Sequence, residues 1–209
     1  MMQPRRTARE LALLSISQLP STPDRLQDQP LQSLIVAAIR TLTLEVRDTL
    51  EVAASELERG SDRLLSSETR AADFRTAHTM VGDAIELTQA AINRMGAALE
   101  LPEFIQLANQ QDVRDYALNI LLKLKEYRPE IDQQINNAMK DWQLSRLARI
   151  DQDILRIAAV EMTCLGVPRQ VAINEAVELA KRYSGEDGHR FINGVLRRVS
   201  DRLPESSPA

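Results

Sequence analysis

Between about residues 67 and 99, apolar side chains recur at alternating spacings of three and four residues. This spacing is typical of a helix that packs lengthwise against a second helix. A comparable pattern covers residues 31–59 and stops at Gly60, so the sequence predicts a long antiparallel helix pair. The residues expected at its seam are Leu34, Ile35, Ala38, Leu42, Val46, Thr49, Ala53 and Leu57 on the first helix, and Phe74, His78, Val81, Ile85, Thr88, Ile92, Met95 and Leu99 on the second.

The rest of the chain also favours helices. Only seven of the 209 residues are glycine and 3% are aromatic, while Ala, Leu, Glu, Gln and Arg are abundant, which favours helices over sheets. Residues 150–165 are largely apolar, which predicts a central core helix that ends before Gly166. The predicted fold class is all-α, with further helices over residues 5–19, 111–127, 129–140, 171–183 and 189–203.

Several classes of protein and site are disfavoured. The longest apolar run, Leu34–Ile39, is far shorter than the roughly 20 residues that cross a membrane, and no secretory signal precedes it. The single cysteine cannot form an internal disulfide, and two histidines argue against a zinc site. We find no phosphate-binding loop, HExxH or GxSxG motif. We therefore expect a cytoplasmic protein without membrane contact, metal, cofactor or catalytic residues.

Charge is distributed unevenly along the chain. Residues 1–20 carry a net charge of +2, residues 21–140 carry −6, and residues 141–209 are balanced. The acidity of the predicted helix pair disfavours direct contact between that pair and RNA.

The carboxyl-terminal third contains specific sequence motifs. These are INEAVELAK at residues 173–181 and FINGVL at 191–196, supported by ILRIA at 154–158 and by AREL at 8–11. With them, the chain resembles the NusB transcription antitermination family over residues 5–19 and about 111–203. Compact members of that family pass from the first helix almost directly to the equivalent of Val113, so the helix pair looks like an insertion.

This resemblance implies a fold of two small helical bundles, interrupted by the inserted antiparallel pair. We expect residues 1–23 and 106–203 to form the NusB-like RNA-binding domain, residues 24–105 the acidic insertion, and residues 204–209 a disordered tail. The resemblance also implies binding of boxA-type single-stranded RNA from ribosomal RNA operons, together with a ribosomal protein that acts as NusE. RNA polymerase carrying this antitermination complex then resists premature termination.

Three arginines at the start of the first helix are candidate RNA contacts. Arg5 and Arg9 are four positions apart and share a helix face with Arg6 nearby, which suits phosphate binding. The alternative is a charged, frayed amino terminus. Because these residues coincide with the arginine-rich RNA-binding segment that the resemblance implies, we expect RNA contact.

A second candidate RNA surface follows the turn at residues 184–188. An aromatic ring beside donors at a helix start can stack on an unpaired base, and the residues concerned are Asp187, Arg190, Phe191 and Asn193. Phe191 has an alternative, because Val195 and Val199 lie on its face and it could pack in the core instead.

Asp151, Arg156 and Glu161 lie on the one polar stripe of the predicted core helix. In the NusB family the corresponding stretch faces the ribosomal-protein partner, so we expect partner contact there. The alternative is an ion pair within the chain.

Two other functions are considered. NusB-like modules also precede the catalytic domain of certain ribosomal RNA cytosine methyltransferases, but we expect no such domain here, because residues 204–209 are too short to form one. A purely structural helical scaffold would have no affinity for nucleic acid.

Overall fold

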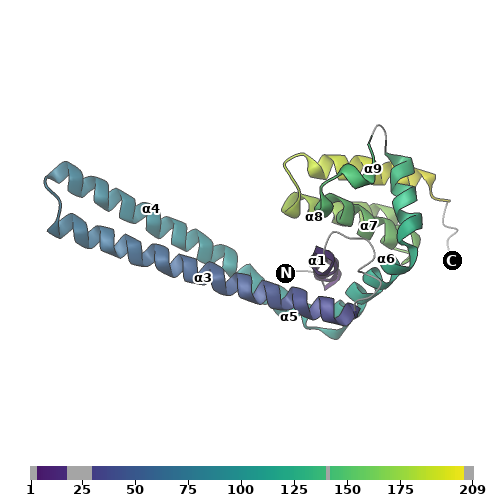
Figure 1. The fold of residues 1–209 in the computed structure, drawn as a ribbon, viewed down its shortest axis with the longest axis horizontal. Helices are drawn as coiled ribbons and strands as arrows, with labels where there is room; N and C mark the ends of the chain where they lie inside the picture. The colour runs from purple at the N-terminus through teal and green to yellow at the C-terminus, as the bar shows by residue number, and fades with distance from the viewer. Residues whose placement is uncertain (1–3, 18–29, 140–141, 205–209) are drawn as a thin grey trace. The chain divides into compact units, whose positions relative to one another are not determined.

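The computed structural model describes residues 4–17, 30–139 and 142–204, and every regular element within these residues is a helix, which confirms the all-α prediction (Figure 1). The elements are α1 (Pro4–Ser17), α3 (Leu31–Thr69), α4 (Phe74–Ala98), α5 (Glu100–Ala108), α6 (Gln111–Ala138), the 3₁₀ helix η1 (Leu144–Arg146), α7 (Arg149–Thr163), α8 (Arg169–Tyr183) and α9 (Gly188–Arg202). None of these helices is long and apolar enough to cross a membrane. From residue 205 onward, the expected tail lies outside the described residues.

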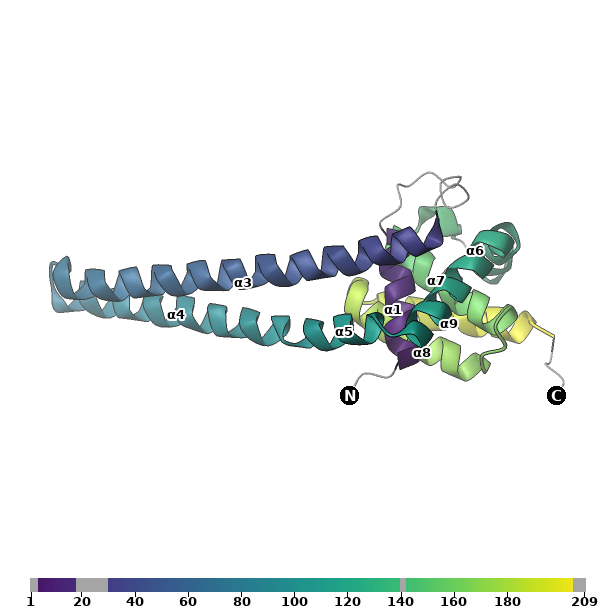
Figure 2. The same ribbon diagram turned by 90° about the horizontal axis from the view of Figure 1, so that it is seen from below.

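The described residues pack as two units, one within 1–38 and 108–209 and the other within 39–107. In the first unit α7 lies among α1, α6, α8 and α9 and contacts all four (Figures 1 and 2). Residues 153–162 of α7 are all buried. The prediction of a central core helix is therefore confirmed. Helix α1 packs against α6 and α7, whereas α8 and α9 pack against each other and against α7.

Helix α6 consists of two helices that meet at a kink, in agreement with the predicted helices over residues 111–127 and 129–140. Tyr127 has non-helical backbone angles (φ −114°, ψ 20°) and separates the two parts. The kink lies two residues before Pro129, which lacks the N–H of a regular helical hydrogen bond. Pro102 lies in the first turn of α5, where proline is tolerated.

The second unit contains the predicted antiparallel pair, with α3 and α4 side by side in both views (Figures 1 and 2). Asp73 caps α4 by accepting a hydrogen bond from the backbone N–H of Thr76 at 2.7 Å. Helix α3 does not end at Gly60 as predicted but continues to Thr69. A side chain at Gly60 would lie 3.3 Å from the Ala84 carbonyl oxygen, so this glycine permits close approach of the two helices.

The predicted seam of α4 is displaced by one position. Ala84 and Ala91 are buried, whereas Ile85 and Ile92, which were expected to point inward, are 54% and 55% exposed. One position along an α-helix is a rotation of about 100°, so the larger side chains occupy the neighbouring face. The helices pack through small residues, and most of the predicted apolar seam of α4 faces solvent.

Candidate nucleic-acid interface

Arg9, one of the three arginines expected to contact RNA, is buried in the first unit. Its side chain is 5% exposed, and its Nε donates to both carboxylate oxygens of Glu161 on α7 at 2.8 and 2.9 Å. Glu161 is itself only 1% exposed. Each charge would be costly to bury alone, so the pair holds α1 against α7. The structure thus contradicts both the phosphate contact expected of Arg9 and the partner contact expected of Glu161.

Tyr116 of α6 is a second donor to the same carboxylate. Its hydroxyl donates to Glu161 Oε1 at 2.5 Å. Burial, followed by this hydrogen bond to the carboxylate, raises the pKa of Tyr116 to about 12. Glu161 therefore joins α1, α6 and α7 in one buried polar network.

We expect this network to weaken in alkali. Folding raises the pKa of Tyr116 from 10 to about 12, so the neutral phenol is favoured in the folded state. Its contribution to stability is complete below pH 10 and is lost as the pH rises toward 12, because a tyrosinate would then face the Glu161 carboxylate. Urea denaturation between pH 9 and 12 should show a steeper loss of stability for the wild type than for Tyr116→Phe. Equal losses in the two proteins would contradict the assignment.

Arg6 and Arg5 are more accessible than Arg9. Arg6 donates from Nε and Nη2 to the two carboxylate oxygens of Glu175 on α8, at 3.1 and 3.0 Å, yet its side chain remains 44% exposed. The exposed Arg5 has its guanidinium carbon 5.1 Å from the centre of the Tyr116 ring. Of the three predicted RNA contacts on α1, two remain available at the surface.

A further charged contact fixes α1 to α8. Glu10 is buried, and its carboxylate accepts from the Tyr183 hydroxyl and pairs with Arg182 at 2.8 Å. Burial raises the pKa of Glu10 above its ordinary value, although both partners act in the opposite direction. The sequence analysis did not predict the buried contacts of Glu10, Tyr116 and Glu175. It also missed the two α8 partners of Glu10, which are Arg182 and Tyr183. The one available signal was the position of Glu175 within the INEAVELAK motif.

The start of α9 presents the second group of predicted RNA contacts. Arg190 and Asp187 form an ion pair at 3.3 Å, and their side chains are 78% and 83% exposed. Phe191 is partly exposed, whereas the adjacent Ile192 is fully buried. Asn193 accepts a hydrogen bond from Arg197 Nε at 3.3 Å. The core therefore does not fully enclose Phe191, and both interpretations of its ring remain available.

Asp151 connects α7 to the turn that precedes α9. Its Oδ1 accepts from the Ser184 hydroxyl at 2.5 Å. A Cβ at Gly188 would lie 1.8 Å from Ser184 Oγ and 2.7 Å from Ser184 Cβ, so only glycine fits without movement of the turn. The structure thus places the expected partner residue Asp151 beside the expected RNA-binding turn.

Arg156 is not on an exposed stripe. Its side chain is 7% exposed and donates to Asp132 at 2.7 and 3.1 Å and to Asp153 at 3.0 Å. Burial raises the pKa of Asp153 despite the neighbouring arginines. The predicted partner contact at Arg156 is wrong, because this guanidinium neutralises two carboxylates of α6 and α7.

Within residues 4–17, 30–139 and 142–204, no cluster of three metal-ligating side chains occurs.

Comparison with known proteins gives consistent matches. Residues 67–201 match the NusB family model. The transcription antitermination protein NusB of Microcystis aeruginosa is 55% identical over 207 residues, covering 99% of this chain and 95% of that protein. Its counterpart in Trichormus variabilis is 59% identical over 201 residues, covering 96% and 95%. The solved structure of T. maritima NusB is similar in fold, with a TM-score of 0.54, 20% identity, and coverage of 97% and 94%.

Proposed function

This chain belongs to the NusB family and acts in transcription antitermination, and from that premise we propose that it binds boxA-type single-stranded RNA in nascent ribosomal RNA transcripts. It binds this RNA together with a small-subunit ribosomal protein in the NusE role. The assembly then helps RNA polymerase to resist premature termination. The protein works in the cytoplasm as an adaptor rather than as an enzyme.

The observation that carries this proposal is the division of the basic residues between the interior and the surface. Arg9 is enclosed in a buried ion pair, whereas Arg5, Arg6 and Arg190 have exposed side chains. Because α1 is fixed by buried pairs, Arg5 and Arg6 lie on a rigid support and lose little freedom when they contact phosphate. Arginine suits this role because its planar group binds phosphate through two hydrogen bonds.

Base recognition is assigned to the start of α9. The partly exposed Phe191 ring supplies a surface for stacking, and the amide of Asn193 supplies donors for a base edge. Asp187 contributes indirectly, because its ion pair with Arg190 restricts the position of that guanidinium. These features favour an unpaired RNA strand over a duplex, whose bases are stacked on one another.

The test is a fluorescence anisotropy titration of the full chain with a boxA-type RNA and a scrambled RNA of the same composition. We expect tighter binding to the boxA-type RNA, because base contacts add to the phosphate contacts that both RNAs share. Equal affinities would show that the protein binds RNA without reading the base sequence. No measurable binding to either RNA would favour the structural scaffold.

We also propose that the hairpin of residues 39–107 is an insertion that RNA binding does not require. Replacing residues 39–107 by a short Gly/Ser linker should leave a helical protein with unchanged RNA affinity, because every proposed RNA contact lies in the other unit. Circular dichroism and the same titration measure both properties. Aggregation or loss of helicity would show that the hairpin belongs to the folding core.

A further inference from the structure

The exposed apolar side chains of the hairpin follow a regular pattern. On α3, Leu50, Leu57 and Leu64 are spaced by seven residues and are 46%, 38% and 48% exposed. On α4, Ile85, Ile92 and Leu99 are also spaced by seven and are 54%, 55% and 76% exposed; Phe74, at the tip, is 85% exposed. A seven-residue period over two helices is typical of a packing surface rather than of scattered surface residues.

Both stripes lie on the same side of the hairpin. Ile85 and Ile92 each follow a buried seam residue by one position, and Leu57 follows the buried Glu56 in the same way. One position is a turn of about 100°. Because the two helices are antiparallel and face each other, a rotation of about 100° about each helix axis places both stripes on the same side of the pair. The hairpin therefore has an apolar face two helices wide.

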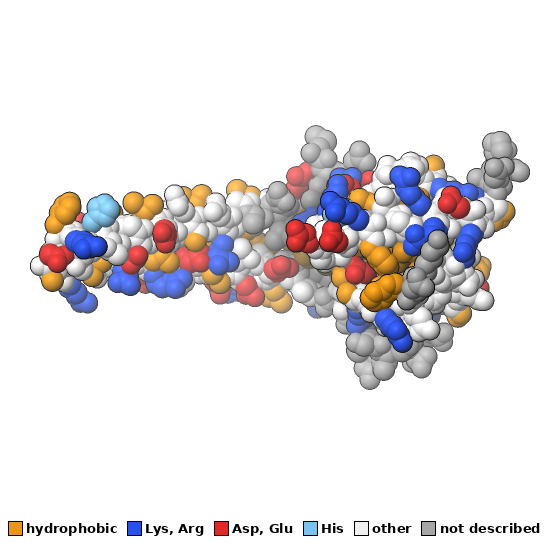
Figure 3. Space-filling view, turned by 90° about the horizontal axis from the view of Figure 1, so that it is seen from above, with side chains coloured by type: hydrophobic (Ala, Val, Ile, Leu, Met, Phe, Trp, Pro, Cys, Tyr) orange, Lys and Arg blue, Asp and Glu red, His pale blue; other side chains and the backbone are white. Residues whose placement is uncertain are grey.

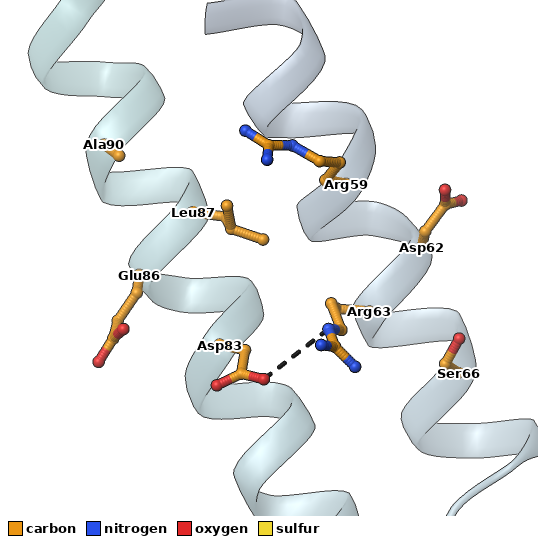
Figure 4. Close-up of a pocket in the computed structure, with 8 residues that line it drawn as sticks. All are labelled: Arg59, Asp62, Arg63, Ser66, Asp83, Glu86, Leu87 and Ala90. Carbon is orange, nitrogen blue, oxygen red and sulfur yellow. Dashed lines mark ion pairs between the residues drawn. The ribbon is translucent and has the colours of Figure 1, made fainter.

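The opposite side of the hairpin is charged. Arg59 and Asp83 each precede a seam residue by one position, so the same rotation carries them away from the apolar face. Arg63 and Asp83 form an ion pair at 3.7 Å across the two helices, with Glu86 nearby (Figure 4). In Figure 3, apolar side chains are spaced along one long edge of the hairpin and most charged ones lie toward the other edge. The hairpin thus has one charged and one apolar side.

The apolar face continues into a groove at the end of the hairpin away from the tip. Leu50 and Ala54 of α3 line it together with Pro102 and Ile105 of α5. Both sides of this groove belong to the 39–107 unit. The surface available for docking therefore runs from Phe74 at the tip to the groove.

We propose that this apolar face binds the same face of a second copy of the chain, forming a four-helix bundle. A two-fold interface needs a surface that complements itself, and here both helices carry apolar stripes with the same seven-residue period. The 25 residues of α4 extend about 37 Å, and two helices side by side are about 20 Å wide. The resulting area of about 700 Å² is close to the roughly 800 Å² that each partner buries in a stable interface.

The charge of the hairpin supports a protein occupant over RNA. Residues 39–107 contain 7 basic and 12 acidic residues, so phosphate would be repelled. In the proposed bundle most of these charges stay in solvent while the exposed Leu and Ile side chains are buried. Close packing through Ala84, Ala91 and Gly60 also leaves the larger side chains free to fill a second interface.

Sedimentation velocity of the full chain over a range of concentrations tests the proposal. We expect the wild type to be dimeric and Ile85→Lys with Ile92→Lys to be monomeric, with helicity retained. The matched control is Thr79→Lys with Ala90→Lys, which adds the same charge to α4 on the stripe that carries Asp83 and Glu86, on the side opposite the apolar face, and should remain dimeric. Leu57→Gln with Leu64→Gln, which weakens the α3 stripe without adding charge, should also shift the equilibrium toward monomer.

Two results would overturn the proposal. A wild type that stays monomeric at its highest soluble concentration would show that the face does not bind a second copy. A dimer that neither pair of apolar substitutions weakens would place the interface elsewhere. Should the lysine variant lose helicity, the glutamine pair on α3 decides between these outcomes.

Discussion

Arg9→Ala should lower the free energy of unfolding by about 3–5 kcal/mol, because it leaves the Glu161 carboxylate buried without its cation. Tyr116 would remain as a donor to that carboxylate, but one neutral hydroxyl does not balance a charge that is 1% exposed. Arg9 also lies 3.4 Å from Glu175, so the substitution weakens a second contact between α1 and α8. Urea denaturation at neutral pH measures the loss.

Two variants separate the ion pair from simple loss of a side chain. Arg5→Ala removes an exposed arginine from the same helix and should change stability by no more than about 0.5 kcal/mol. Arg9→Met with Glu161→Gln removes both charges while keeping an acceptor for Tyr116, and it should recover most of the stability. If Arg9→Ala costs no more than Arg5→Ala, the pair does not hold α1 in place.

The second large effect concerns the ribosomal-protein partner of the proposed assembly. We expect this partner to raise boxA RNA affinity by about 5- to 150-fold, and RNA to raise partner affinity by the same factor, since coupling of about 1–3 kcal/mol is reciprocal. The physical basis is the contact between Asp151 and Ser184, which joins the expected partner site to the turn before α9. A partner that contacts Asp151 would stabilise this turn and so the start of α9.

Two substitutions distinguish the partner site from the RNA site. Asp151→Asn removes the charge but keeps an acceptor for Ser184, so it should weaken partner binding and leave RNA affinity without partner unchanged. Phe191→Ala should lower RNA affinity by about 1–3 kcal/mol, the usual contribution of one stacked base. Titrations give the dissociation constant of RNA with and without the partner, and that of the partner with and without RNA. If Asp151→Asn weakens RNA binding in the absence of partner, the two sites are not separate.

The sequence predicted the central helix because residues 154–160 of α7 are apolar except for Arg156, and a run of this kind favours the core. The role of Arg9 could not be predicted in this way. Its partner Glu161 is 152 positions away, and local spacing alone cannot distinguish an arginine that meets phosphate from one that meets a distant carboxylate. The same limit applies to Arg156, whose partner Asp132 is on another helix.

The hairpin shows a different limit of periodicity. The antiparallel pair was predicted, although α3 continues beyond Gly60, but α4 has small residues and large apolar residues on adjacent faces with the same period. The predicted seam included Phe74, Ile85 and Ile92 because of their three- and four-residue spacing, whereas close approach at Gly60 brings the small residues together. Periodicity identifies a face that can pack, but side-chain size and the neighbouring helix decide which face of α4 packs against α3.

The central claim is that Arg5 and Arg6 contact RNA phosphates while Arg9 supports the fold, and the salt dependence of RNA affinity tests it most directly. Each phosphate contact with a single strand contributes a slope of about 0.7 to the plot of log affinity against log salt concentration. Arg5→Gln with Arg6→Gln should therefore weaken boxA RNA binding and reduce the slope by about 1.4, with helicity unchanged. An unchanged slope and affinity in this variant would contradict the claim.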